Sequence, residues 1–167
     1  MTRPLLLVFS GLLATVLLLA ACTKSSDYGR FISVPTDGWS DAAPLVFDTD
    51  TLPPGAYDLQ LIVRTSADHS YPFGELALLV RHESTTKADS TGHAITARSD
   101  SLISFALYDN DGSPEGRGLS LREHETEAGC VWLSDTAAVR ITVNHHMHGG
   151  IISGISAVGM SLKKRQS

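Results

Sequence analysis

The sequence contains only two cysteines, Cys22 and Cys130, among its 167 residues. Because Cys22 has a different expected role, described below, no cysteine is left to pair with Cys130, and an internal disulfide is excluded. Cys130 stands between Gly129 and Val131, and we expect it to be a small buried side chain. The stability of the fold is therefore expected to come from a hydrophobic core.

Positive charge is also in short supply. The chain has 13 Lys and Arg residues against 18 Asp and Glu, which gives a formal net charge of −5. This balance argues against a nucleic-acid partner and against electrostatic binding to anionic lipid. The hydrophobic content of 43% is enough for the core of one ordinary domain.

The apolar residues after the first 21 positions lack helical periodicity. They alternate with polar residues in segments separated by turn signals, which is typical of half-buried strands. The predicted strands cover 45–49, 57–64, 76–80, 103–107, 139–143 and 158–162. We expect an all-β, single-domain fold, an antiparallel β-sandwich or jelly-roll-like structure.

Three segments are less regular. Leu119 and Leu121 are expected to face inward on a strand, and residues 131–133 form a short apolar piece with Trp132. Residues 83–98 are rich in Ser, Thr, Asp and Lys, and this composition predicts a long exposed loop or a frayed hairpin.

The N-terminus carries the only long apolar run. Arg3 is followed by an uncharged stretch, residues 5–21, that ends in Leu-Ala-Ala-Cys at Cys22. A basic start, an apolar run and small residues before a cut are typical of a secretory signal, and the cysteine makes it the lipobox of a bacterial lipoprotein. An uncleaved transmembrane helix is the alternative, but about 17 apolar residues is short for one.

These patterns divide the chain into four parts. We expect a signal peptide at 1–21, a lipidated tether at 22–30, a β-sandwich domain at 31–163 and a C-terminal tail at 164–167. Several acyl chains on Cys22 would anchor the protein stably. The two residues after Cys22 lack the aspartate that retains some lipoproteins in the inner membrane, which favours the outer membrane.

Two polar clusters are candidate metal sites. Asp109 and Asp111, followed by a glycine, resemble the start of a calcium loop, although a tight turn explains the same residues. His146 and His148 share one face of a strand and can hold zinc or copper if a third ligand comes from elsewhere. The alternative there is a solvated strand end with a buried, hydrogen-bonded His145.

Four aromatic residues stand beside turns: Trp39, Tyr71, Phe73 and Trp132. They can plug the ends of the sandwich, which is the favoured interpretation for Trp39 and Phe73. They can instead form a platform for a partner protein or a glycan. An enzyme is not expected: His148 and the two glycines after it resemble part of an oxyanion hole, but the chain lacks a Gly-x-Ser-x-Gly elbow.

Motifs along nearly the whole mature chain resemble, in order and spacing, the GldH-type gliding-motility lipoproteins. They are Cys22, Tyr28 with Phe31, Gly38-Trp39 with Asp41, Phe47-Asp48, Tyr57-x-Leu59-x-Leu61-x-Val63-Arg64, Tyr71-Pro72-Phe73, Asp100-Ser101-Leu102, Leu107-x-Asp109, Gly112, Gly116-x-Gly118, His145 or His146 with Met147, and Gly154-Ile155-x-x-Val158-Gly159.

The resemblance implies a non-catalytic component of the cell envelope. Its implied partners are the membrane, through the lipid, and envelope proteins of the gliding motility or type IX secretion machinery. It implies no cofactor other than the lipid on Cys22. A lipid-tethered sandwich that binds a glycan or a metal is the alternative function.

Overall fold

The computed structural model describes residues 28–66, 71–86 and 93–166. The strands are β1 (Tyr28–Ser33), β2 (Trp39–Ser40), β3 (Leu45–Asp48), β4 (Gly55–Ser66), β5 (Glu75–Thr86), β6 (Thr96–Ala106), β7 (Leu121–Leu133), β8 (Ala137–His145), β9 (Ile151–Ile152) and β10 (Ile155–Lys164). Within these ranges no helix is long and apolar enough to cross a membrane. The expected signal peptide, residues 1–21, and Cys22 lie outside the described part.

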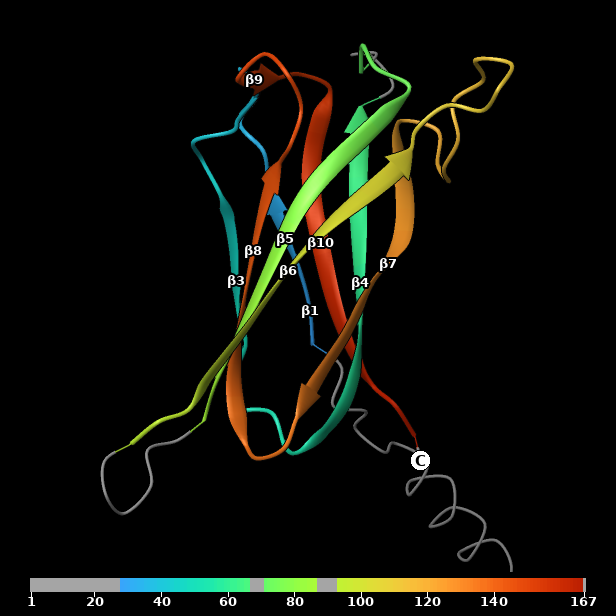
Figure 1. Ribbon diagram of the computed structural model, residues 1–167. Helices are drawn as coiled ribbons and strands as arrows, with labels where there is room; N and C mark the ends of the chain where they lie inside the picture. The colour runs from blue at the N-terminus through green and yellow to red at the C-terminus, as the bar shows by residue number, and fades with distance from the viewer. Residues whose placement is uncertain (1–27, 67–70, 87–92, 167) are drawn as a thin grey trace, which may run out of the picture.

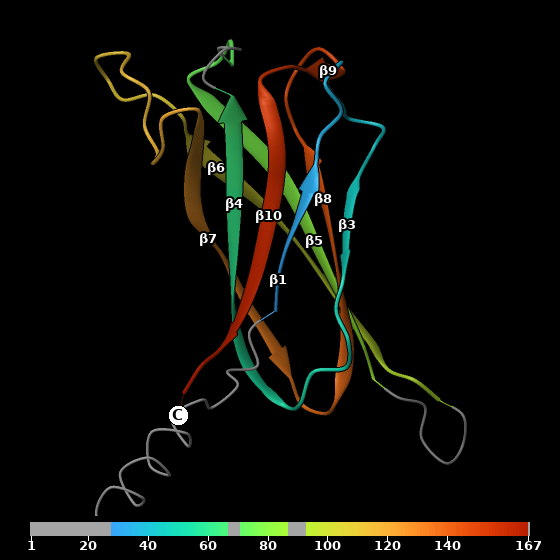
Figure 2. The same cartoon turned by 180° about the vertical axis from the view of Figure 1, so that it is seen from behind.

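The strands form two four-stranded antiparallel sheets with the orders β1-β10-β4-β7 and β3-β8-β5-β6. The sheets pack face to face, and β2 and β9 form a small ribbon at the upper end in Figures 1 and 2. With this ribbon set aside, the connections between the remaining strands follow the two Greek keys of a jelly roll. The predicted all-β, jelly-roll-like sandwich is confirmed.

The core lies between the two sheets and follows the alternation of the sequence. β4 buries Tyr57, Leu59, Leu61 and Val63, whose neighbours in sequence are only partly buried. β5 and β8 supply the facing side chains in the same alternating way. Such alternation is expected where each antiparallel sheet buries one face and leaves the other in water. The strands predicted at 57–64, 76–80, 139–143 and 158–162 are confirmed within β4, β5, β8 and β10.

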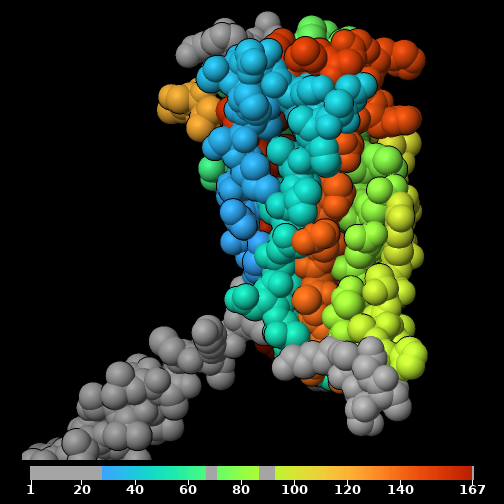
Figure 3. All heavy atoms as spheres, turned by 90° about the vertical axis from the view of Figure 1, so that its left-hand side faces the viewer, coloured from blue at the N-terminus to red at the C-terminus, as the bar shows by residue number. Residues whose placement is uncertain are grey.

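The first sheet and the second sheet come close along one side of the sandwich. Figure 3 looks onto this side, where β1 and β3 lie next to each other. The Tyr28 hydroxyl donates a hydrogen bond of 2.9 Å to the carbonyl oxygen of Asp48, which links the two edge strands. β1 begins at Tyr28 and β10 ends at Lys164, so the sandwich extends slightly beyond the expected limits of 31 and 163.

A β-bulge in β7 explains two predictions that were wrong. Leu59 pairs with Gly129 and Gln60 pairs with Glu127, so Ala128 is an extra residue in β7. The bulge shifts the inward-facing positions from even numbers to odd numbers. Cys130, which was expected to be buried, is therefore exposed. Within the apolar piece 131–133, Val131 and Leu133 face inward and Trp132 faces outward.

Before the bulge, the even-numbered residues of β7 face inward, so the odd-numbered Leu121 faces outward. Leu121, which was expected to face inward, is 45% exposed, and Leu119 is 93% exposed in the loop before β7. Both ends of the polar segment 83–98 are paired strand, because β5 continues to Thr86 and β6 begins at Thr96. The hairpin interpretation is therefore confirmed, and only the part of the segment between Thr86 and Thr96 lies outside the strands.

The alternation predicts different costs for neighbouring substitutions on β4. Leu61→Ala removes a fully buried side chain and should lower the free energy of unfolding by about 2–5 kcal/mol. Ile62→Ala, on the outward face, should cost clearly less. Urea unfolding followed by circular dichroism measures both. Equal losses would contradict the sidedness of the sheet.

Candidate functional site

The four aromatic residues of the predicted platform do not gather on one surface. Trp39 is 1% exposed and Tyr71 is 3% exposed, whereas Phe73 is 41% exposed and Trp132 is 71% exposed. Phe73 precedes β5 at the upper end of the sandwich, and Trp132 lies near the end of β7 at the lower end (Figure 1). The platform is therefore wrong as a shared surface. The plug interpretation is correct for Trp39 and wrong for Phe73.

Trp39 and Tyr71 are held by specific contacts at the upper end. The Trp39 indole N–H donates to the carbonyl oxygen of Ala43 at 2.9 Å, and its ring meets the His145 ring edge-on at 5.4 Å. The Tyr71 hydroxyl donates to the carbonyl oxygen of Glu75 at 3.3 Å. Burial raises the pKa of the Tyr71 phenol. Both residues therefore stabilise the fold rather than offer a binding surface.

The two predicted metal clusters also fail to form sites. No group of three or more His, Cys, Asp or Glu side chains converges as metal ligands in the described part of the chain. The Asp109 carboxylate accepts hydrogen bonds from the backbone N–H groups of Asp111, at 3.0 Å, and Ser113, at 2.7 Å. This contact explains the Asp109–Gly112 turn without calcium. His146 and His148 are exposed.

His145 continues the inward face of β8, as the sequence suggested, and is 3% exposed. Its Nδ1 accepts a hydrogen bond from the backbone N–H of Met147 at 3.4 Å. Among the described residues, Nε2 of this histidine has no hydrogen-bond partner. The buried histidine of the alternative interpretation is therefore present, with only one of its ring nitrogens bonded.

A cleft of about 490 Å³ opens between β6 and β7, which are the outermost strands of the two sheets on the side opposite β1 and β3. Residues 104–106 of β6 form one wall, residues 123–126 of β7 form the other, and residues 115–117 close the upper part. Sequence analysis missed this cleft. Its one signal in the sequence is the alternation of glutamates at 123, 125 and 127, which marks a strand with a polar outer face.

The backbone of β7 is partly available at this edge. Glu123 exchanges two backbone hydrogen bonds with Arg117, of 3.0 and 2.8 Å, on the side away from β4. Backbone groups of a strand alternate between its two sides, so Glu125 directs its N–H and carbonyl to the same outer edge. Arg117 covers the edge only at Glu123. The edge beside Glu125 is thus able to pair with another extended chain.

His124 lies beneath the cleft and is 6% exposed. Its Nε2 is 3.3 Å from the hydroxyl of Thr65. A Cβ atom on Gly116 would lie 2.9 Å from the His124 ring, so only glycine fits here. Burial lowers the pKa of His124; the Glu115 carboxylate opposes this effect and Arg122 adds to it. The imidazole is therefore neutral at pH 7.

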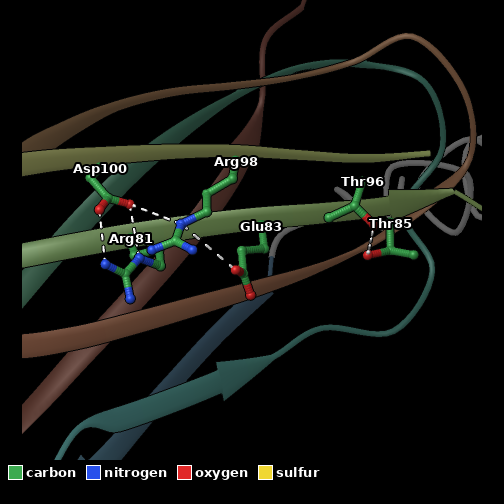
Figure 4. A network of polar contacts seen from close by, with 6 residues as sticks. All are labelled: Arg81, Glu83, Thr85, Thr96, Arg98 and Asp100. Carbon is green, nitrogen blue, oxygen red and sulfur yellow. Dashed lines mark hydrogen bonds and ion pairs between the residues drawn. The ribbon is translucent and has the colours of Figure 1, made fainter.

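A second polar surface lies on the outer face of β5 and β6 in the β3-β8-β5-β6 sheet (Figure 4). Arg81 donates two hydrogen bonds of 2.9 Å to the carboxylate of Asp100, and this contact lowers the pKa of that carboxyl. Arg98 lies 3.5 Å from Asp100 and 3.9 Å from Glu83. Because these charges neutralise one another, the face is a weaker candidate for a binding site than the cleft.

Comparison with known protein families gives one decisive match. The model of the GldH lipoprotein family matches residues 27–162. The chain belongs to the GldH lipoprotein family. This GldH-family chain is accordingly a membrane-anchored lipoprotein of the cell envelope. A search of curated proteins finds no significant match.

Solved structures with some similarity to this GldH-family chain are distant. A protein of Sulfurospirillum deleyianum is 8% identical with a TM-score of 0.42, over 84% of this chain and 99% of that one. The VP2 subviral particle of infectious bursal disease virus is 11% identical, with a TM-score of 0.32, over 86% and 34%. Latent dimeric PorU of Porphyromonas gingivalis is 10% identical, with a TM-score of 0.33, over 85% and 14%. Because these TM-scores are all below 0.5, the jelly-roll assignment rests on the strand order and not on these structures.

Several residues that carry the family resemblance pack together outside the core. The Arg64 guanidinium lies 3.8 Å from the centre of the Phe31 ring. A Cβ on Gly159 would lie 2.5 Å from that ring, so the glycine lets Phe31 lie flat on the sheet. Arg64 also pairs with Glu123 at 2.6 Å. The contacts of Phe31, Arg64 and Glu123 thus link β1 to β7 across the two strands between them, β10 and β4.

The buried His124 predicts a pH dependence of stability. Its pKa in the folded protein is below the value of about 6.5 expected in the unfolded chain, so the unfolded state binds more protons as the pH falls through that value. The free energy of unfolding should therefore fall between pH 7.5 and pH 5, and His124→Gln should make this fall shallower. Burial lowers the pKa of His82 as well, so part of the slope should persist.

Urea titrations at several pH values measure these slopes. His148→Gln, at an exposed histidine, is the matched control and should leave the slope unchanged. The same slope for His124→Gln and the unmodified protein would contradict the assignment.

Proposed function

We propose that this chain is a lipid-anchored, non-catalytic component of the gliding motility or type IX secretion machinery that holds a protein partner at the envelope. The observation that carries this proposal is the family match over residues 27–162, which takes in nearly the whole sandwich. The role in that machinery follows from what the family resemblance implies.

Cys22 is the proposed site of lipid attachment. It ends the only long apolar run and follows Leu19-Ala20-Ala21, which is the lipobox pattern. The residues after it, Thr23 and Lys24, favour the outer membrane over the inner one. The lipid on Cys22 is the only non-protein group that the proposal requires.

The cleft between β6 and β7 is the proposed contact for the partner. Natural sheets normally protect their edges, and an extended peptide that adds to a free edge gains main-chain hydrogen bonds. The β7 edge beside Glu125 offers such bonds, and the cleft offers about 490 Å³ next to it. Glu123 is neutralised by Arg64, so Glu115 and Glu125 face Arg117 there, and this small negative excess favours a partner segment of positive charge.

The proposed role predicts which proteins accompany the lipoprotein. Crosslinking in its own cells, followed by purification of the tagged, lipidated protein and mass spectrometry, should recover motility or secretion components. Recovery of only porins and abundant lipoproteins, together with normal gliding and secretion in a deletion strain, would overturn the proposal.

The proposed contact predicts an effect of proline at the β7 edge. Glu125→Pro removes a backbone donor from the outer edge and spares the bonds to β4, so the fold should persist while partner recovery falls. Glu125→Ala keeps the donor and is the matched control, and it should retain most of the recovery.

Circular dichroism checks that both variants are folded. Equal recovery with the proline variant, the alanine variant and the unmodified protein would show that the partner binds elsewhere.

A further inference from the structure

Two large apolar side chains are exposed together at the lower end of the sandwich. Trp132 is 71% exposed and Ile95 is 72% exposed. Both line one small pocket of about 70 Å³, together with Ala97 and the buried Leu133. Ser84, Thr86, Ser134 and Asp135 also line this pocket, so Trp132 and Ile95 form a small exposed patch with polar neighbours that joins the end of β7 to the β5–β6 hairpin.

The strand register places this patch at the end where the lipid tether enters. Tyr28, the first residue of β1, pairs with Leu162, which pairs with Leu59 of β4. Trp132 pairs with Ala56, three positions closer to the lower end. At about 3.3 Å per residue, Trp132 lies roughly 10 Å farther toward that end than Tyr28 does. Figures 1 and 2 show the start of β1 and the end of β7 in this lower part.

The tether is short enough to bring this end to the membrane. Cys22 precedes Tyr28 by six positions, and six residues span about 20 Å at full extension. A lipid on Cys22 therefore keeps Tyr28 within about 20 Å of the bilayer surface. The register position of Trp132, beyond Tyr28 toward this end, brings the exposed ring within reach of the same surface. This step rests on the proposed lipidation of Cys22.

We infer that the patch of Trp132 and Ile95 is a membrane-docking surface that inserts into the interface of the phospholipid bilayer holding the lipid anchor. Tryptophan favours this interface because its ring is apolar and its indole N–H remains near water and headgroups. Docking fixes the orientation of the sandwich, so the upper part of the cleft, beside residues 115–117, faces away from the membrane.

Charge makes a minor contribution to this docking. The exposed Lys163 and Lys164 lie at the same end, because the backbone N–H of Arg165 donates to the carbonyl oxygen of Ala56. However, Arg165 is paired with Asp58 at 2.6 Å, and Asp135 borders the pocket beside Trp132 and Ile95. The apolar contact therefore carries the interaction, and docking is expected on zwitterionic lipid without anionic headgroups.

Tryptophan fluorescence tests this inference directly because the chain has two tryptophans, one at each end. The full-length, lipidated protein is reconstituted into phosphatidylcholine vesicles with and without brominated phosphatidylcholine. Brominated lipid should quench the emission of the unmodified protein, and the emission maximum should move to shorter wavelength on reconstitution. Trp132→Phe leaves only the buried Trp39 and should abolish both effects.

A matched pair of variants tests the second residue of the patch. Ile95→Ser should reduce the quenching of Trp132, whereas Leu119→Ser should not. Leu119 is equally apolar and 93% exposed, but it lies in the loop before β7 at the upper end.

Vesicle flotation separates the failure of docking from the failure of anchoring. Protein that floats with vesicles but shows equal quenching with and without Trp132 would overturn the docking surface and leave the lipid anchor intact. Protein that does not float would overturn both. A Trp132 that is not quenched and instead crosslinks to another protein in cells would assign the patch to a protein partner and overturn the inference.

Discussion

The central strands of this sandwich bury one face against the opposite sheet, and this alternation determines which groups remain available on the surface. β4 shows the constraint in full, with Tyr57, Leu59, Leu61 and Val63 all turned inward. In β7 the bulge at Ala128 reverses the alternation part of the way along the strand. Above the bulge the strand presents glutamates to water, and below it the strand presents Trp132.

The bulge therefore gives the two halves of one edge strand different surfaces. The upper half borders an acidic cleft whose backbone is partly unpaired. The lower half carries an apolar side chain toward the end where β1 begins. Bulges are often found at sheet edges, where they redirect side chains. In this chain the redirection separates the surface that we propose for a protein partner from the one that we propose for the membrane.

The sequence was sufficient to predict the fold class and most core strands, because alternation along 57–64, 76–80 and 139–143 is a local signal. It was insufficient for Cys130 and Leu121, whose orientation depends on a bulge that no local pattern marks. The predicted metal clusters and aromatic platform did not form, for a related reason. Asp109, His146 and Trp39 have suitable chemistry, but only the tertiary arrangement decides whether such groups converge. The cleft depends on which strands form the edges, and that is a property of topology.

We propose that the sandwich presents its β6–β7 cleft to a protein partner while the lipid holds it at the membrane. A photoreactive amino acid in place of Glu125, in the lipidated protein in living cells, tests this claim most directly. We expect one discrete crosslinked protein from this position and none from Val46, an exposed residue of β3 at the opposite side of the second sheet. Equal crosslinking from both positions, or from neither, would contradict it.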